Sequence, residues 1–163
     1  MSATFGAIPG VVSPGQSLTG LTLSCANAGP AAATAADCVP TADVGTVSNL
    51  SCSPATPTSL ASGSSIACTF DYLAPGTAGG TDTAETDVTF TGTASASNDS
   101  NAGNNVDTAS ADVIDALDDA VSSPGGSTGQ TFDVSSNDDV PAGSSFSVTG
   151  GCLLYTSPSP RDS

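Results

Sequence analysis

Four cysteines are the residues of this sequence with the clearest chemical potential. Cys25, Cys38, Cys52 and Cys68 are even in number once Cys152, in the atypical C-terminal segment, is set aside, and neither a CxxC pair nor a histidine accompanies them. This disfavours zinc, which structural sites bind through clustered Cys and His ligands. The pattern favours two disulfides formed in an oxidising compartment, and of the three possible pairings we favour Cys25 with Cys38 and Cys52 with Cys68, which close short loops. Four buried free thiols in a cytosolic protein are the alternative.

Carboxylates are the second group that could carry chemistry. A late cluster contains Asp112, Asp115, Asp118 and Asp119. The loop before it carries further oxygen ligands, namely Asp99, Asn101, Asn104, Asn105 and Asp107. Because Ca²⁺ prefers hard oxygen ligands, the cluster could form a calcium site at a junction between two modules. A solvated acidic linker is the alternative, since Ser110 stands where an EF-hand loop would place a glutamate.

The charge balance excludes several functions. The 163 residues include 16 Asp and Glu, one Lys or Arg and no His, for a net charge of -15. Without an imidazole base or a lysine amine, we expect no enzymatic activity, and apart from calcium we expect no cofactor. Nucleic acids and anionic membranes would repel such a chain. No apolar run approaches the roughly 20 residues of a membrane span, so we expect no membrane insertion.

A folded scaffold must position these residues, and the composition provides few large apolar residues for its core. Leu, Ile, Val and Phe supply only 29 of the 163 residues, a share typical of disordered chains. Short alternating apolar runs, regular turn residues and paired cysteines nevertheless favour a β core reinforced by disulfides. The Ala-rich run 31–36 lacks an apolar stripe of helical period, so we interpret it as a loop that enters a strand.

Alternation of apolar and polar residues predicts three clear strands. They are centred on Leu21 to Cys25, Ile66 to Tyr72 and Val88 to Ala94, each with one apolar and one polar face, as in half-buried antiparallel strands. Weaker strands are expected at Phe5 to Val12, Ala35 to Val39, Gly45 to Cys52 and Val106 to Ile114. The sequence therefore predicts an all-β, antiparallel sandwich of about seven strands, supported by disulfides.

The composition changes twice after this first domain. Near Ile114 the acidic cluster intervenes, and residues 117–151 look like the start of a second β repeat, with strands at about Thr131 to Val134 and Ser145 to Thr149. Residues 152–163 contain the only basic residue and resemble a translated transposase sequencing adapter. We therefore exclude them from fold reasoning and expect neither end of the chain to be a natural terminus.

Several turn motifs resemble a known family. They are Val12-Ser-Pro-Gly-Gln-Ser17, Cys25-Ala-Asn-Ala-Gly-Pro30, Ala74-Pro-Gly76 and Asn98-Asp-Ser-Asn-Ala-Gly-Asn-Asn105. Together they resemble the Ig-like conserved repeat domain of large bacterial cell-surface and secreted proteins, over residues 5–114. The Asn-rich turn is the most specific of these motifs. The following residues, Asp118-Asp119 and Phe132-Asp-Val-Ser-Ser-Asn-Asp138, resemble the start of a cadherin-like tandem repeat.

The resemblance implies a structural role. It implies an Ig-like sandwich within a stalk or adhesin, at the cell surface or outside the cell. The expected partners are neighbouring repeats of the same polypeptide and an unidentified host or matrix ligand. An accessory module of a secreted hydrolase that binds a carbohydrate or another ligand is the alternative. A calcium-dependent adhesion junction is a third hypothesis. Many related surface domains carry Lys-Asn isopeptide bonds, which a chain without lysine cannot form, and disulfides could serve instead.

Overall fold

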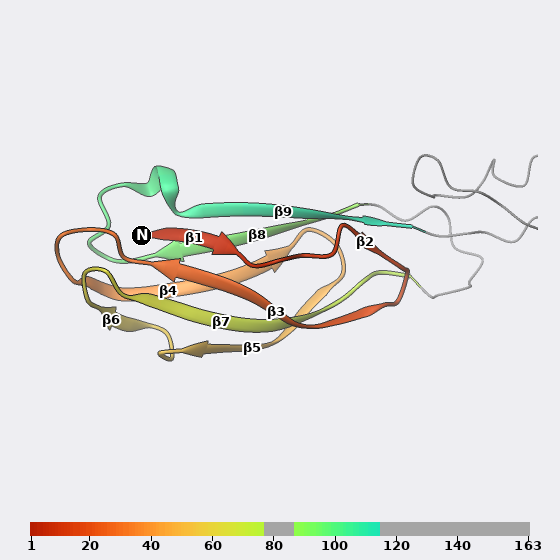
Figure 1. Cartoon of the computed structure of the whole chain (residues 1–163), viewed down its shortest axis with the longest axis horizontal. Helices are drawn as coiled ribbons and strands as arrows, with labels where there is room; N and C mark the ends of the chain where they lie inside the picture. Colours follow the sequence, from red (N-terminus) through yellow and green to blue (C-terminus); the bar gives the residue numbers. More distant parts are fainter. Residues whose placement is uncertain (77–86, 115–163) are drawn as a thin grey trace, which may run out of the picture.

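The computed structural model describes residues 1–76 and 87–114, which form two packed β-sheets (Figure 1). The strands are β1 (Ser2–Phe5), β2 (Val11–Val12), β3 (Ser17–Ala26), β4 (Ala33–Ala42), β5 (Thr46–Ser53), β6 (Thr58–Leu60), β7 (Ser65–Leu73), β8 (Val88–Ser95) and β9 (Val106–Val113). A single 3₁₀ turn, η1 (Ala102–Asn104), is the only helical element among the described residues. The all-β, disulfide-containing fold predicted from the sequence is therefore confirmed.

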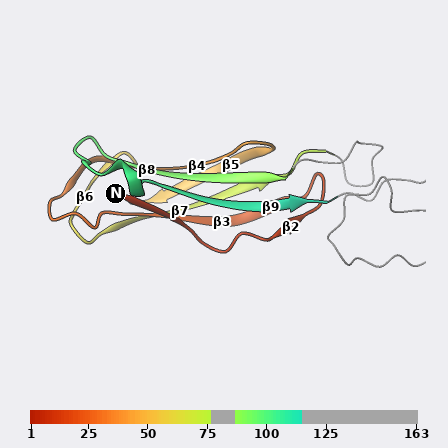
Figure 2. The same cartoon turned by 90° about the horizontal axis from the view of Figure 1, so that it is seen from above.

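The two sheets differ in size and order. The four-stranded sheet has the order β1-β3-β7-β5, and the five-stranded sheet has the order β2-β9-β8-β4-β6. Neighbouring strands are antiparallel except β2 and β9, which are parallel. Figure 2 shows the two sheets from above, with the long strands running along the length of the molecule.

The core lies between the sheets and follows the alternation seen in the sequence. Every second residue is buried in β3 from Leu21 to Cys25, in β7 and in β8, as the patterns of Leu21 to Cys25, Ile66 to Tyr72 and Val88 to Ala94 predict. Four aromatic rings meet there, and the closest pair is Tyr72 and Phe90, whose centroids are 4.8 Å apart. Edge-to-face contacts of this kind add to the free energy gained from burial.

Gly92 brings the two sheets together at the centre of β8. A Cβ atom at this position would lie 2.5 Å from Cδ1 of Leu23 and 3.1 Å from the ring of Phe5. Both neighbours belong to the opposite sheet, so only a residue without a side chain lets them approach this closely.

Two expected features of the strand list are corrected. The stretch Phe5 to Val12 is not one strand, because β1 ends at Phe5 and the chain resumes pairing only at Val11. Pro9 and Gly10 interrupt it, since proline has no N–H to donate and glycine weakens a strand. The short strand β6 was also not expected. With this split and β6, the described residues contain nine strands rather than about seven. The predicted strands at 131–134 and 145–149, and the predicted adapter at 152–163, lie outside the described residues.

Candidate functional site

The two disulfides have different places in the fold. Cys25 on β3 is bonded to Cys38 on β4, so this bond joins the two sheets, with its Cα atoms 5.7 Å apart. Cys52 on β5 is bonded to Cys68 on β7, directly opposite it in the same sheet, with Cα atoms 4.0 Å apart. These are the pairs favoured from the sequence. Such bonds are typical of proteins that fold in an oxidising compartment.

The four sulfur atoms gather in one region of the core. The Sγ atoms of Cys52 and Cys68 lie 3.9 Å and 3.7 Å from the carbonyl oxygen of Cys38. Both sulfurs of the bond inside the four-stranded sheet therefore lie beside the backbone of Cys38, one of the two residues of the intersheet bond. Cys25 and Cys38 have no exposed surface and Cys68 is 1% exposed, whereas Cys52 is only partly buried.

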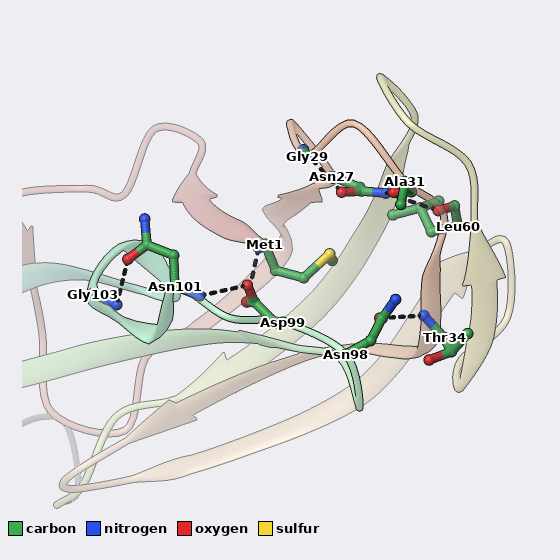
Figure 3. A network of polar contacts seen from close by, with 10 residues as sticks. All are labelled: Met1, Asn27, Gly29, Ala31, Thr34, Leu60, Asn98, Asp99, Asn101 and Gly103. Carbon is green, nitrogen blue, oxygen red and sulfur yellow. Dashed lines mark hydrogen bonds and ion pairs between the residues drawn. The ribbon is translucent and has the colours of Figure 1, made fainter.

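Asp99 organises the loops at one end of the sandwich (Figure 3). Its Oδ2 accepts a hydrogen bond of 2.8 Å from the N-terminal ammonium of Met1, and its Oδ1 accepts one of 3.1 Å from the Asn101 backbone N–H. The bond from the ammonium and, after it, the Asn101 bond hold the pKa of Asp99 below its ordinary value. The residue thus acts as an ionised anchor for the chain end.

Two asparagines fasten the neighbouring loops. Asn27 is buried, and its Nδ2 donates to the carbonyl oxygens of Ala31 and Leu60, while its Oδ1 accepts from the Gly29 N–H. Asn98 also uses both ends of its side-chain amide. Its Oδ1 accepts from the Thr34 N–H, as Figure 3 shows, and its Nδ2 donates to the Ala32 carbonyl oxygen.

A shallow hollow of about 230 Å³ lies among these loops. Its lining combines the anchor residues Met1, Asn27, Asn98 and Asp99 with the backbone and small side chains of residues 29–33. The amide groups that face it already hold loops together, and none of its lining residues is aromatic. General acid and base catalysis on a glycoside requires two carboxyl groups, and Asp99 is the only one in the lining. The lining therefore lacks the pair of carboxyl groups that this glycosidase mechanism uses.

The expected calcium ligands are only partly within the described residues. Asp112 lies on β9, whereas Asp115, Asp118 and Asp119 lie outside the described residues. Of the loop residues, Asp99 binds the Met1 ammonium and Asp107 accepts the Phe5 N–H at 2.8 Å. Over residues 1–76 and 87–114, no group of three or more Cys, His, Asp or Glu residues is arranged to hold a metal ion. The calcium site stays a prediction.

Asp71 is a structural site that the sequence analysis did not identify. It lies on β7, and both neighbouring strands carry an irregularity beside it, between Leu18 and Leu21 on β3 and between Ser48 and Ser51 on β5. Its carboxylate accepts the Gly20 N–H at 2.9 Å and the Asn49 side-chain amide at 2.8 Å. These two bonds, first that of Asn49, lower the pKa of Asp71.

Tyr72 is the buried titratable group of the core. Its side chain has no exposed surface, and its hydroxyl has no hydrogen-bond partner within the part of the chain that the structure describes. Burial raises the pKa of this hydroxyl, and the negative charge of Asp43 raises it further. The hydroxyl packs close to Gly45, where a Cβ atom would lie 2.5 Å away. Tyr72 is thus a core residue whose surroundings favour the neutral hydroxyl.

Neither a search for membrane-spanning helices nor comparison with known proteins assigns a function. In the described part of the chain, no helix has the length and apolar character needed to span a membrane. No family model, curated protein or solved structure matches the chain.

Proposed function

We propose that this chain is a non-enzymatic structural or adhesive repeat module of a long bacterial protein, outside the cell or at its surface, within a stalk or adhesin. The observation that carries the proposal is the path of the chain. Met1 lies toward one end of the sandwich, and β9 leaves at the other end (Figures 1 and 2). A module with this path can be joined to neighbours along one axis.

The pairing of β2 with β9 suits such a module for tension. β2 and β9 are parallel, and the N–H groups of Asp112 and Ile114 donate to the carbonyls of Gly10 and Val12, each at 3.0 Å. Force applied at the two ends pulls these strands in opposite directions along their own axes. The hydrogen bonds are then loaded together, in shear, instead of opening one at a time.

Disulfides and charge support the same role. The Cys25–Cys38 bond joins the sheets covalently, which compensates for a core poor in large apolar residues. A net charge of -15 makes neighbouring copies repel one another, which favours an extended arrangement. The hydrolase accessory module is less well supported, because all four aromatic residues of the described ranges, Phe5, Phe70, Tyr72 and Phe90, pack in the core cluster.

Single-molecule stretching of the full chain between its two ends tests the proposal. We expect one cooperative rupture of the sandwich. Reduction should then lengthen the released chain, because the disulfides span 13 and 16 residues and each residue adds about 3.5 Å, or about 100 Å in total.

A matched pair of variants isolates the terminal strands. Ile114→Pro removes the N–H that donates to Val12, whereas Ile114→Val keeps it. We expect a lower rupture force for the proline variant alone. An equal force in both variants, or stretching of the native chain without a force peak, would contradict a load-bearing role.

A further inference from the structure

The four cysteines differ in their access to solvent, and this difference has a chemical consequence. Cys52 lies on β5, the open edge strand of the four-stranded sheet, and is only partly buried. Its partner Cys68 lies on the next strand inward and is 1% exposed. Cys25 and Cys38 have no exposed surface. Thiol–disulfide exchange depends on access to the attacked sulfur, so only the bond at the sheet edge is open to reagents in solution.

We propose that Cys52 is a modification site for low-molecular-weight thiols and that Cys68 relays the exchange to the buried Cys25–Cys38 bond. The site rests on the disulfide geometry alone and is independent of any load-bearing role. It predicts that the intersheet bond of the folded protein opens only after the edge bond has opened.

In the first step, an external thiolate attacks Sγ of Cys52 along the line of the S–S bond. The attack forms a mixed disulfide on Cys52, breaks the bond to Cys68 and releases Cys68 as a thiolate, which can take up a proton. Because Cys68 lies on the inner side and β5 has no strand beyond it in the sheet, the line of attack opposite Cys68 leads to the open edge. The equivalent lines to Cys25 and Cys38 are covered by the core.

In the second step, the Cys68 thiolate attacks Sγ of Cys38. The thiolate starts beside this residue, since Sγ of Cys68 is 3.7 Å from the backbone carbonyl oxygen of Cys38. A Cys38–Cys68 bond forms and Cys25 leaves as a thiolate. The number of disulfides is conserved through both steps, because one is now the mixed disulfide on Cys52 and the other joins Cys38 to Cys68. No oxidant is required, because each step exchanges one disulfide for another and releases one thiolate.

The test uses the full chain with Cys152→Ser, which removes the fifth cysteine, and 2-mercaptoethanol as the external thiol. Samples are quenched with acid over time, alkylated and mapped by mass spectrometry of peptides. The expected order is mercaptoethanol on Cys52 first, followed by alkylation of Cys25. First appearance of mercaptoethanol on Cys25, Cys38 or Cys68 would overturn the proposal.

A double variant tests the relay separately. Cys52→Ala with Cys68→Ala removes the edge bond and leaves the buried bond in place. With the fold verified by circular dichroism, we expect the Cys25–Cys38 bond of this variant to open more than about tenfold more slowly than in the parent, because its access is blocked.

Two single variants provide the matched control. Cys52→Ala leaves Cys68 as the free thiol, and we expect a fraction of molecules with the Cys38–Cys68 bond. Cys68→Ala leaves the edge residue Cys52 free instead, and we expect Cys25–Cys38 to persist. Equal opening of the buried bond in the double variant and the parent, or equal exchange in the two single variants, would refute the relay.

Discussion

The two sheets of this sandwich are built by different rules. In the four-stranded sheet, the register of β7 with β3 and with β5 shifts on both sides of the strand. In the five-stranded sheet, β8 pairs with β4 and with β9 without interruption, and Thr41, Thr91 and Thr108 are direct neighbours across the three strands. The irregularity of this sheet lies at its edge instead, between Ala33 and Ala36 where β4 pairs with β6. Its centre is held by repeated cross-strand pairs of this kind. The four-stranded sheet, whose register is interrupted, is held instead by specific side-chain bonds.

These bonds are the hydrogen bonds of Asp71 on one face of the four-stranded sheet and a disulfide on the other. Asp71 binds the irregular segments of β3 and β5 through Gly20 and Asn49, and the Cys52–Cys68 bond closes the pairing of β5 with β7. Register irregularities such as those in β3 and β5 interrupt the ladder of backbone hydrogen bonds and increase the local twist of the strands. Strand pairing in the four-stranded sheet therefore depends on a few single residues. The contact between the two sheets depends on the residues that face the core.

The largest expected effect distinguishes the bond between the sheets from the bond within one sheet. Cys25→Ala with Cys38→Ala should lower the free energy of unfolding by about 3 kcal/mol through loop entropy, and by more because the fully buried sulfurs leave a cavity. Cys52→Ala with Cys68→Ala should cost about 3 kcal/mol or less, because Cys52 is partly exposed. Urea unfolding followed by circular dichroism measures both, and equal losses would break the distinction.

The second prediction concerns the close approach of the sheets at Gly92. Gly92→Ala should destabilise the protein by about 1–3 kcal/mol, because the new methyl group would overlap Leu23 and press on Phe5. Gly10→Ala is the control, since a Cβ atom there meets nothing within 4 Å. Thermal melts of the two variants should differ clearly. A harmless Gly92→Ala would mean that the sheets can separate at this point at little cost.

The third prediction addresses the irregular segment of β5. Asn49 has a φ of 52°, in the left-handed region that asparagine and glycine tolerate. Asn49→Ala should therefore cost about 1 kcal/mol, while Asn49→Gly restores the backbone freedom and should cost less. Urea midpoints give both values. If the alanine variant were no less stable than the glycine variant, the segment would not be held in this conformation.

The smallest expected effect is the pH dependence that Asp71 contributes. Its pKa in the folded protein lies below its ordinary value of 3.8. The stabilisation is therefore complete above pH 3.8 and is lost as the pH falls through the depressed pKa. Comparing the native chain with Asp71→Asn cancels the other carboxylates, Asp99 included, whose pKa is also lowered. We expect the stability difference between the two proteins to shrink below pH 4, and a difference that grew on acidification would have the wrong sign.

Much of the scaffold could be predicted from the sequence, because the alternation of apolar and polar residues along a strand indicates which side chains are buried. Leu21 to Cys25, Ile66 to Tyr72 and Val88 to Ala94 gave three central strands whose inward residues are those of the observed core. The favoured cysteine pairs also match the observed bonds, since cysteines close in sequence meet most readily in a thin β core.

Other features could not be predicted, because their causes lie far away along the chain. The short strand β6 exists only through its pairing with β4, and three residues carry no usable pattern of their own. Asp99 meets an ammonium group 98 residues away. Asp71 looked like an ordinary outward residue of β7, and its two partners come from different strands.

The sequence by itself determined the class of fold, the strong negative charge and the pairing chemistry of the cysteines, since these follow from residue type and local period. Only the tertiary structure decided which cysteine is accessible, which glycine lets the sheets approach closely and which carboxylate holds the irregular strands. Access, close approach and hydrogen bonding are properties of atoms brought together by folding, and no local pattern records which distant residues will become neighbours.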